Sequence, residues 1–438
     1  MSLSFNRRHF IGSTAAAFAA LTASGCHART VRQAAGYGPL LTDRAGLLDL
    51  PAGFSYRVLS ALGEIMDDGG RVPDAADGMG CIALPGGKLA LIRNHELRPG
   101  KDSGGASGLA YDRDSSGAIL PGGTTTLILD QASLKVERQF RSLSGTIRNC
   151  AGGITPWGSW LTCEEDVTRA GPRVGQDHGW VFEVPASATG PVPPVPLKAL
   201  GRFNHEAACV DPRTGTIYLT EDRDDSLLYR FVPQVRGKLA AGGQLQALAL
   251  HDPRGAADTR NWAAASWSAG QTARVRWIEL DNPERPNDDL RQRGAALGAA
   301  LFARGEGIHM GAGELFFACT SGGAAKLGQV FRLKLGRGGD RLELFFESAD
   351  PAQFNYGDNL TVAPDGQLVV CEDQYSAVSD NHLRGLTRRG EPYPLARVAI
   401  QTEPAGACFS PDGRVLFVNL YSPAKTLAIT GPWAHLKA

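Results

Sequence analysis

Residues 149–166 read Asn-Cys-Ala-Gly-Gly-Ile-Thr-Pro-Trp-Gly-Ser-Trp-Leu-Thr-Cys-Glu-Glu-Asp and predict a β-hairpin. A short arm begins at Cys150, a turn occupies residues 155–158, and a second arm ends at Glu164, Glu165 and Asp166. Because a hairpin brings its two outer ends together, we expect Cys150 to lie near Glu164. A thiol beside carboxylates can hold a metal ion. The alternative is a buried cysteine next to a solvated acidic turn.

Five further stretches repeat this pattern of a polar or acidic start, a short arm, a Gly-containing turn and an apolar arm with a polar end. They span residues 77–96, 204–222, 306–321, 358–373 and 403–419. Their Asp-Gly and Gly-Gly turns supply the positive φ of tight hairpins. Apolar arms such as residues 368–371 are continuous, which indicates burial on both faces.

Six such hairpins predict an all-β fold, a six-bladed β-propeller with helical and loop insertions. Further strands of the blades are expected at residues 125–129, 180–184, 227–232, 330–335 and 342–346. The largest insertion covers about residues 236–303. It is predicted to end in a helix over residues 288–303, with Asn287 as N-cap and Gly305 as C-cap.

In a propeller all six hairpins begin and end at one mouth of the channel. The predicted inner ring of side chains is Asp77, Cys150, Glu206, Glu306, Asp358 and Glu403. The predicted second ring is Glu96, Glu164, Glu221 and Glu372. Uncompensated carboxylates at close range repel one another, so such rings bind cations or retain protons. Oxygen donors favour calcium or magnesium, and the Cys150 thiol adds a softer metal such as iron. The alternative is that these residues are blade-edge caps and surface turns.

Two histidines and one arginine flank the predicted rings. His95 and His205 each precede a glutamate, and adjacent strand residues face opposite ways. We therefore expect Glu96 and Glu206 to be the ligands, with the histidines behind them. Arg304, two residues before Glu306, is placed either to bind a phosphate or another oxyanion or to stabilise a helix C-terminus.

The start of the chain predicts an export signal over residues 1–28. Arg7-Arg8 precedes a short apolar run, as in signals read by the twin-arginine export machinery. Residues 23–26 resemble a lipoprotein signal ending at Cys26, and plain cleavage near Ala28 is the alternative. We expect a protein exported folded to the periplasm or the cell-envelope surface, with one propeller domain at residues 40–438.

Charge and cysteine spacing exclude several classes of protein. The 45 basic and 45 acidic residues balance, which argues against nucleic acid as a partner. The eight cysteines include no CxxC pair, which argues against a zinc ribbon. We expect a monomer that acts on a small molecule.

Several motifs resemble those of the PhoX-type alkaline phosphatases. They are Cys-Ala-Gly-Gly-Ile-Thr-Pro-Trp-Gly at 150–158, Leu-Thr-Cys-Glu-Glu at 161–165, Asp-His-Gly-Trp at 177–180, Gly-Arg-Phe-Asn-His-Glu at 201–206, Arg-Gly-Glu-Gly at 304–307, and Asp358-Asn359. The resemblance runs over residues 77–423. It implies a six-bladed propeller, exported by the twin-arginine route, that hydrolyses phosphate monoesters with iron and calcium ions at its channel mouth.

The resemblance also implies roles for individual residues. Cys150 would be the thiolate bound to iron, Glu206 and Glu306 catalytic ligands of the cluster, and Arg304 the residue that holds the substrate phosphate. Further implied ligands are Glu96, Glu164, Glu221, Asp358, Asn359 and Glu372. Cys163 adjoins Glu164 but lies within the apolar arm, so packing explains it better. The chain is shorter than well-known members, which leaves the substrate open.

Two other functions fit the acidic rings alone. A calcium-dependent propeller lactonase or esterase needs carboxylates and asparagine in the channel but neither thiolate nor iron. A non-catalytic propeller would bind calcium for stability and present a surface to a partner. Cys150 and Arg304 favour the phosphatase over both.

Overall fold

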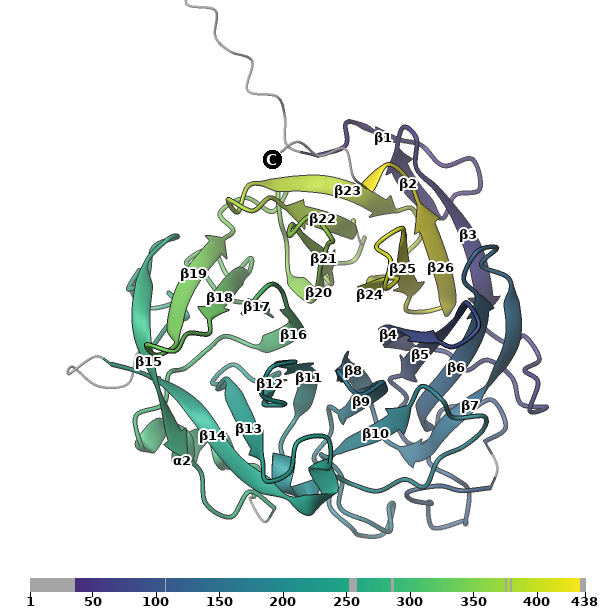
Figure 1. The fold of residues 1–438 in the computed structure, drawn as a ribbon, viewed down its shortest axis with the longest axis horizontal. Coiled ribbons are helices and arrows are strands. Elements are labelled where there is room, and N and C mark those ends of the chain that lie inside the picture. The colour runs from purple at the N-terminus through teal and green to yellow at the C-terminus, as the bar shows by residue number, and fades with distance from the viewer. Residues whose placement is uncertain are drawn as a thin grey trace, which may run out of the picture. The chain divides into compact units, whose positions relative to one another are not determined.

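Antiparallel strands dominate the computed structural model and are arranged around a central axis (Figure 1). The model describes residues 36–106, 108–251, 258–284, 287–374, 376–378 and 380–433. The predicted signal, with Arg7, Arg8 and Cys26, lies outside these residues. Within them, no helix has the length and apolar character that a membrane span requires.

Six strands stand innermost, and each packs against the next so that the last returns to the first. They are β4 (Ala76–Leu84), β8 (Asn149–Ile154), β11 (His205–Val210), β16 (Gly305–Met310), β20 (Gly357–Val362) and β24 (Pro404–Phe409). Each pairs with the next strand in the chain: β5 (Lys88–His95), β9 (Ser159–Glu164), β12 (Ile217–Glu221), β17 (Glu314–Cys319), β21 (Leu368–Glu372) and β25 (Val415–Leu420). These are the six hairpins expected from the sequence, and the all-β propeller prediction is confirmed.

The outer strands extend these hairpins into sheets. The five predicted outer segments correspond to β6 (Gly122–Asp130), β10 (Val181–Pro185), β13 (Tyr229–Pro233), β18 (Gln329–Lys334) and β19 (Arg341–Glu347). The other outer strands are β7 (Val136–Thr146), β14 (Gly243–Leu250), β15 (Thr272–Glu279), β22 (His382–Leu386), β23 (Pro392–Val398) and β26 (Lys425–Thr430). Strand β15 bonds to both β14 and β19, which joins two neighbouring sheets into one of nine strands.

The two ends of the domain close the circle. Strand β3 (Ser55–Ala61) pairs with β26, so a strand from the start of the domain completes the sheet built by its end. Similarly, β1 (Leu40–Leu41) pairs with β2 (Leu48–Pro51), and β2 pairs with β23. These pairings bring residues more than 300 positions apart into one sheet, as for Lys425 opposite Ala61.

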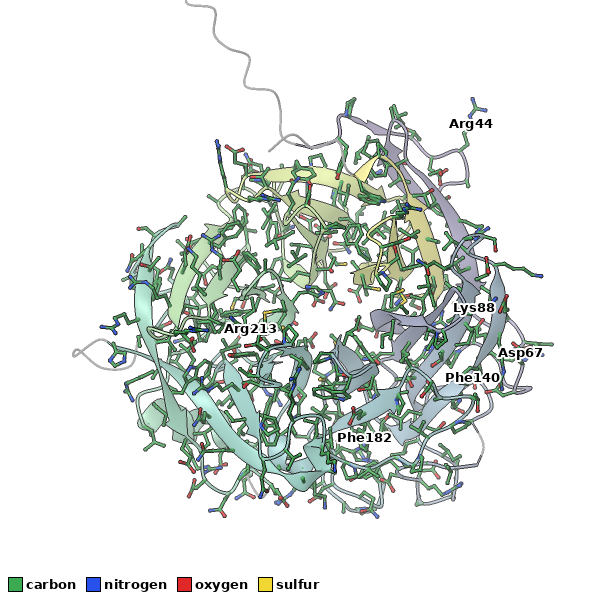
Figure 2. The ribbon with its side chains drawn as sticks, in the orientation of Figure 1. Arg44, Asp67, Lys88, Phe140, Phe182 and Arg213 are labelled. Carbon is green, nitrogen blue, oxygen red and sulfur yellow. The ribbon has the colours of Figure 1, made fainter. Side chains whose placement is uncertain are left out.

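Apolar side chains fill the space between neighbouring sheets. Phe140 and Phe182 are both buried, whereas Asp67 is exposed and lies at the edge of the domain (Figure 2). Cys163 is fully buried in a cluster with Leu161 and Val181, as expected for a packing residue.

The predicted helix over residues 288–303 is wrong in length. Helix α2 covers only Leu290–Ala296 and is preceded by Asp289, whose side chain makes no capping bond. Gly298, at φ +95°, directs the chain away from the helical path. Residues 299–303 then run extended, with Ala300 N–H donating to Leu248 O and Phe302 N–H to Ser226 O. Asn287 and Gly305 are therefore not helix caps.

Glycines allow the inner strands to approach one another closely. A Cβ atom at Gly153 of β8 would overlap the carbonyl oxygen of Ala208 on β11. A Cβ atom at Gly307 of β16 would lie 2.5 Å from the Leu360 nitrogen on β20. In both cases the obstacle is backbone, which cannot rotate away.

We predict that Gly153→Ala lowers the free energy of unfolding by about 1–3 kcal/mol, because β8 and β11 must separate to admit the methyl group. Urea denaturation of the metal-free protein measures this change. Gly190→Ala is the control: no atom lies within 4 Å of a Cβ atom built there. It should shift the free energy by about 0.5 kcal/mol or less. Equal effects of the two variants would contradict close packing of the inner strands.

Candidate metal centre

Every inner strand carries a β-bulge near its first residue. The register shifts fall between Ala76 and Met79, Asn149 and Gly152, His205 and Ala208, Gly305 and Ile308, Gly357 and Leu360, and Ala405 and Cys408. In each hairpin two residues on the inner strand therefore face one on its partner. A bulge re-aims the side chains that it contains. The first bulge residues are Asp77, Cys150, Glu206, Glu306, Asp358 and Gly406.

Five of these six positions match the predicted inner ring, and the sixth corrects it. Gly406, not Glu403, is the bulge residue of β24, and a Cβ atom there would overlap the carbonyl oxygen of Asp77. Glu403 precedes the strand but still reaches the same charged cluster. Its pKa is raised by burial, by a hydrogen bond with Asp373, and by the charges of Asp77 and Asp358.

Three of the four residues predicted for the second ring are wrong by one position along the chain. Glu164, Glu221 and Glu372 pair with the residue before each bulge, and so does His95. The next residue in each chain segment approaches the mouth instead. These mouth residues are Glu96, Glu165, Asp222 and Asp373.

Glu164, Glu221 and Glu372 are fully buried inside their own sheets and bonded there. Glu164 accepts hydrogen bonds from three backbone N–H groups, of Ile147, Gly179 and Trp180, and contacts His178 Nδ1 at 2.6 Å. Glu221 accepts from Tyr229 Oη at 2.7 Å and Arg291 Nη1 at 3.4 Å.

Glu372 accepts hydrogen bonds from Asn355 N–H, His382 N–H and Arg384 Nε. The structure thus does not bring these three glutamates to the channel, and their oxygens already have donors.

The mouth instead collects nine carboxyl groups and one thiol. They are Asp77, Glu96, Cys150, Glu165, Glu206, Asp222, Glu306, Asp358, Asp373 and Glu403. Their mutual contacts include Cys150 Sγ, which donates to Asp77 Oδ2 at 3.4 Å.

Burial and mutual repulsion disfavour negative charge throughout this cluster. Burial, followed by the charge of Glu306, raises the pKa of Glu206 well above its usual range. The same two causes, with Asp222 as the leading charge, act on Glu306. Burial and the charge of Asp373 raise the pKa of Asp358 to about 7. Burial and the charge of Asp77 raise the pKa of the Cys150 thiol.

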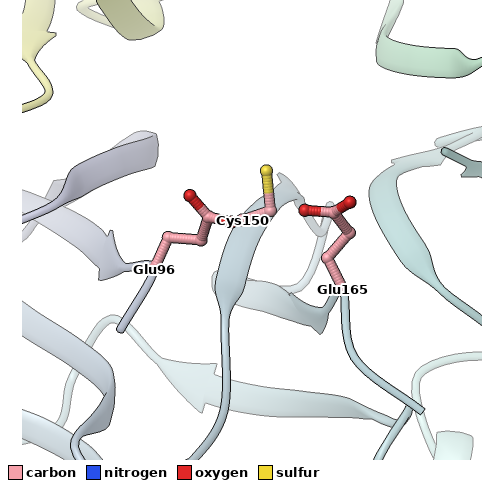
Figure 3. Close-up of side chains that lie close together, drawn as sticks. All are labelled: Glu96, Cys150 and Glu165. Atoms are coloured by element: carbon pink, nitrogen blue, oxygen red, sulfur yellow. The ribbon is translucent and has the colours of Figure 1, made fainter. Parts of the chain in front are cut away.

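Two sets of donors within the cluster are close enough to share an ion. Glu96, Cys150 and Glu165 form the thiol group, whose ligand atoms lie within 4.8 Å of one another (Figure 3). Glu206, Glu306 and Asp358 form the carboxylate group, with the same spacing. Glu206 Oε1 is buried without a hydrogen-bond partner, which suits it as a ligand to a cation. The donors suit a transition metal at the thiol group and calcium or magnesium at the carboxylate group.

Arg304 lies beside the carboxylate group. Its Nε and Nη2 bond to the two oxygens of Asp222 at 2.7 and 2.9 Å, and Nη2 lies 3.2 Å from Glu306 Oε1. Because α2 ends at Ala296, Arg304 is not at a helix C-terminus. That alternative from the sequence is wrong.

Asn359 and the histidines have supporting positions. Asn359 Oδ1 accepts from Gly406 N–H at 2.7 Å, so its side chain links β20 to β24. His95 contacts Asp74 O and Thr125 Oγ1, each at 2.9 Å, and His205 Nε2 contacts Gly201 O at 2.9 Å. Both histidines face away from the cluster, as the alternation along a strand predicts.

Four residues of the site were not predicted from the sequence: Glu165, Asp222, Asp373 and Arg148. Arg148 Nη2 lies 2.5 Å from both Glu96 Oε1 and Glu165 Oε2. A signal for the three acids was present, because applying the alternation seen at His95-Glu96 to the other hairpin ends selects Glu165, Asp222 and Asp373.

We predict that Glu165→Gln and Glu164→Gln have opposite signatures. Glu165→Gln should remove at least ~90% of the metal bound at the thiol group while leaving metal-free stability within about 1 kcal/mol. Glu164→Gln should lower the free energy of unfolding by about 2–4 kcal/mol, since an amide NH₂ would face backbone donors. Elemental analysis and urea denaturation measure the two effects. Metal loss at unchanged stability in Glu164→Gln would restore Glu164 as a ligand.

We predict that the metal-free protein loses stability as pH rises from about 5 to 8. The folded state holds protons on Asp358 and its neighbours more tightly than the unfolded chain does. Folding therefore becomes less favourable as pH passes from the ordinary carboxyl pKa toward the folded-state values. Thermal unfolding in a chelator measures this trend, and added calcium should abolish it. A midpoint that rises over this pH range would contradict the proposed charge repulsion.

Comparison with known proteins gives one family. The model of the family "Alkaline phosphatase PhoX" matches residues 35–134 and 121–424. The structure is similar to that of Pseudomonas fluorescens PhoX in complex with vanadate, a transition state analogue. Identity is 19%, the TM-score is 0.68, and the match covers 91% of this chain and 98% of that one.

Other matches are weaker. The gluconolactonase XC5397 of Xanthomonas campestris is 12% identical with a TM-score of 0.41, over 91% of this chain and 98% of that one. No curated protein matches the sequence. Because the family model spans nearly the whole described domain, the chain belongs to the PhoX alkaline phosphatase family.

Proposed function

We propose that this phosphatase hydrolyses phosphate monoesters at the mouth of its channel, where the thiol group holds iron and the carboxylate group holds calcium. The observation that carries the proposal is the position of Arg304 beside the carboxylate group, at a mouth that also holds the thiol group. A guanidinium and bound cations together provide complementary charge for a phosphoryl dianion.

The donor atoms support the choice of metals. Cys150 contributes the sulfur of the thiol group, and a thiolate favours a transition metal over calcium. Glu206, Glu306 and Asp358 offer oxygen donors that suit calcium. Deprotonation of these groups accompanies metal binding, because the bound charge offsets the burial that otherwise raises their pKa values.

Cations bound at the two groups would act as Lewis acids on the phosphoryl oxygens. The chain's own contribution is to orient the phosphate. Both carboxylate oxygens of Asp222 accept hydrogen bonds from Arg304, which fixes the plane of the guanidinium. A planar guanidinium of fixed orientation suits the equatorial oxygens of a phosphoryl group. Burial of the surrounding carboxylates strengthens each of these electrostatic interactions.

The main alternative to the phosphatase is a calcium-dependent lactonase. It would require the carboxylate group but would have no need of Cys150 or Arg304. Elemental analysis of the exported protein separates the two proposals, since the phosphatase should contain iron together with calcium and the lactonase only calcium. A non-catalytic propeller would lose thermal stability on calcium removal and hydrolyse no ester.

We also propose that the folded protein is exported by the twin-arginine machinery to the periplasm or the cell-envelope surface, where it acts as a monomer. The Arg7-Arg8 pair supports the route. Cys26 offers a site for a lipid anchor. Replacing both arginines with lysine should retain the protein in the cytoplasm, as cell fractionation would show.

We predict that Glu306→Gln lowers kcat/KM for a phosphate monoester by at least ~100-fold and lowers bound metal in parallel, because the variant removes a charged ligand beside Arg304. Steady-state kinetics and elemental analysis on the same sample measure this. Glu314→Gln is the matched control, since Glu314 begins the partner strand β17 at the turn of the same hairpin, away from the mouth. Full activity and metal content in Glu306→Gln would refute the proposal.

A further inference from the structure

The six hairpins share a rim position two residues before each bulge residue. Its occupants are Ala75, Arg148, Asn204, Arg304, Tyr356 and Pro404. Four of them have a left-handed backbone, with φ of 52° at Ala75, 46° at Arg148, 53° at Arg304 and 52° at Tyr356. Positive φ is uncommon outside glycine. Its recurrence shows that Arg148 and Arg304 occupy equivalent places in the repeat.

Three consecutive inner strands, β8, β11 and β16, carry N–H donors at this position. Arg148, Asn204 and Arg304 therefore follow one another along the rim, and we call them the donor arc. Asn204 Nδ2 donates to Glu165 Oε1 at 3.0 Å. Arg148 also contacts Glu165, and Arg304 contacts Glu306. The arc thus runs from the thiol group to the carboxylate group.

The two arginines have matching surroundings. Each arginine forms ion pairs with ligands of a candidate metal group. Arg148 pairs with Glu96 and Glu165 of the thiol group, and Arg304 pairs with Glu306 of the carboxylate group. Their side chains are 17% and 22% exposed, so both reach solvent at the mouth. Cations bound at these carboxylates would take over the neutralisation of Glu96 and Glu165. Arg148 Nη1 would still donate to the Glu165 carbonyl oxygen. Its Nε and Nη2, which bond to the two carboxylates, would instead be able to bind an anion.

We propose that Arg148 and Asn204 complete the phosphate site, so that the donor arc binds the phosphoryl oxygens of the substrate from more than one side. This inference rests on the proposed phosphatase function. One guanidinium engages two oxygens of a tetrahedral anion, which leaves the remaining oxygens for a second guanidinium and an amide. Anion binding and metal binding are consequently coupled through Glu165, which contacts two members of the arc.

The test measures binding of inorganic vanadate by calorimetry to protein loaded with iron and calcium, with metal content determined on the same samples. Arg148→Gln should raise the Kd for vanadate by at least ~10-fold per loaded site, and Asn204→Ala by about 3–10-fold. Arg291→Gln is the control. Its guanidinium binds Glu221, Asp225 and Asp288 behind the mouth, so vanadate affinity should be unchanged.

A more conservative substitution tests the proposal if the Arg148→Gln protein does not bind the metals. Arg148→Lys keeps the charge beside Glu96 and Glu165 but lacks the planar fork. It should load both metals and still bind vanadate several-fold more weakly. An unchanged Kd per loaded site in Arg148→Lys and Asn204→Ala would overturn the donor arc. A loaded wild-type protein that neither binds vanadate nor hydrolyses monoesters would instead refute the proposed function.

Discussion

The one-residue bulge that recurs in all six inner strands determines which side chains meet at the channel mouth. Without the bulge, successive side chains along each hairpin would point to opposite faces of its sheet in strict alternation. The bulge interrupts this alternation. The first bulge residue of each inner strand therefore faces the channel just inside its mouth. The glycines that let neighbouring inner strands approach, such as Gly153 and Gly307, keep these side chains within reach of one another.

Adjacent acidic residues have opposite roles because their hydrogen-bond donors differ. Glu164 is surrounded by three backbone N–H groups and a histidine, so its charge is stabilised by its own sheet. Glu165, the next residue, has burial and the charge of Glu96 acting against its ionisation, with Arg148 opposing them. A carboxylate with a full set of donors is structural, whereas one whose main partner is a guanidinium can exchange it for a cation.

Turn chemistry and apolar runs were sufficient to predict the six hairpins, and repetition was sufficient to predict the propeller. The thiol at Cys150 and the carboxylates at Glu206, Glu306 and Asp358 followed from aligning those hairpins. Sequence alone does not show a bulge, because a bulge depends on pairing with the partner strand. The far ends of three hairpins were predicted one residue too early, at Glu164, Glu221 and Glu372, although the alternation at His95-Glu96 selects the next residue in each. The helix predicted over residues 288–303 was too long because tertiary pairing overrode local propensity. Residues 299–303 bond to β14 and Ser226 instead of continuing the helix.

The site arises from differences between six equivalent positions. Cysteine at one bulge provides the softer donor, and glycine at another, Gly406, carries no side chain because the Asp77 backbone lies against it. Burial, the charge of Glu96 and the charge of Asp358 together raise the pKa of Asp77. On the opposite arc the rim bears Arg148, Asn204 and Arg304, whereas the rim beside Gly406 bears Tyr356, Pro404 and Ala75. At this rim position the two positive charges, those of Arg148 and Arg304, therefore lie on the same side of the mouth. In the proposed phosphatase, an anion at the mouth would meet donors on that side and the candidate metal ligands beneath, so the asymmetry of the repeat would fix the direction from which a phosphoryl group binds.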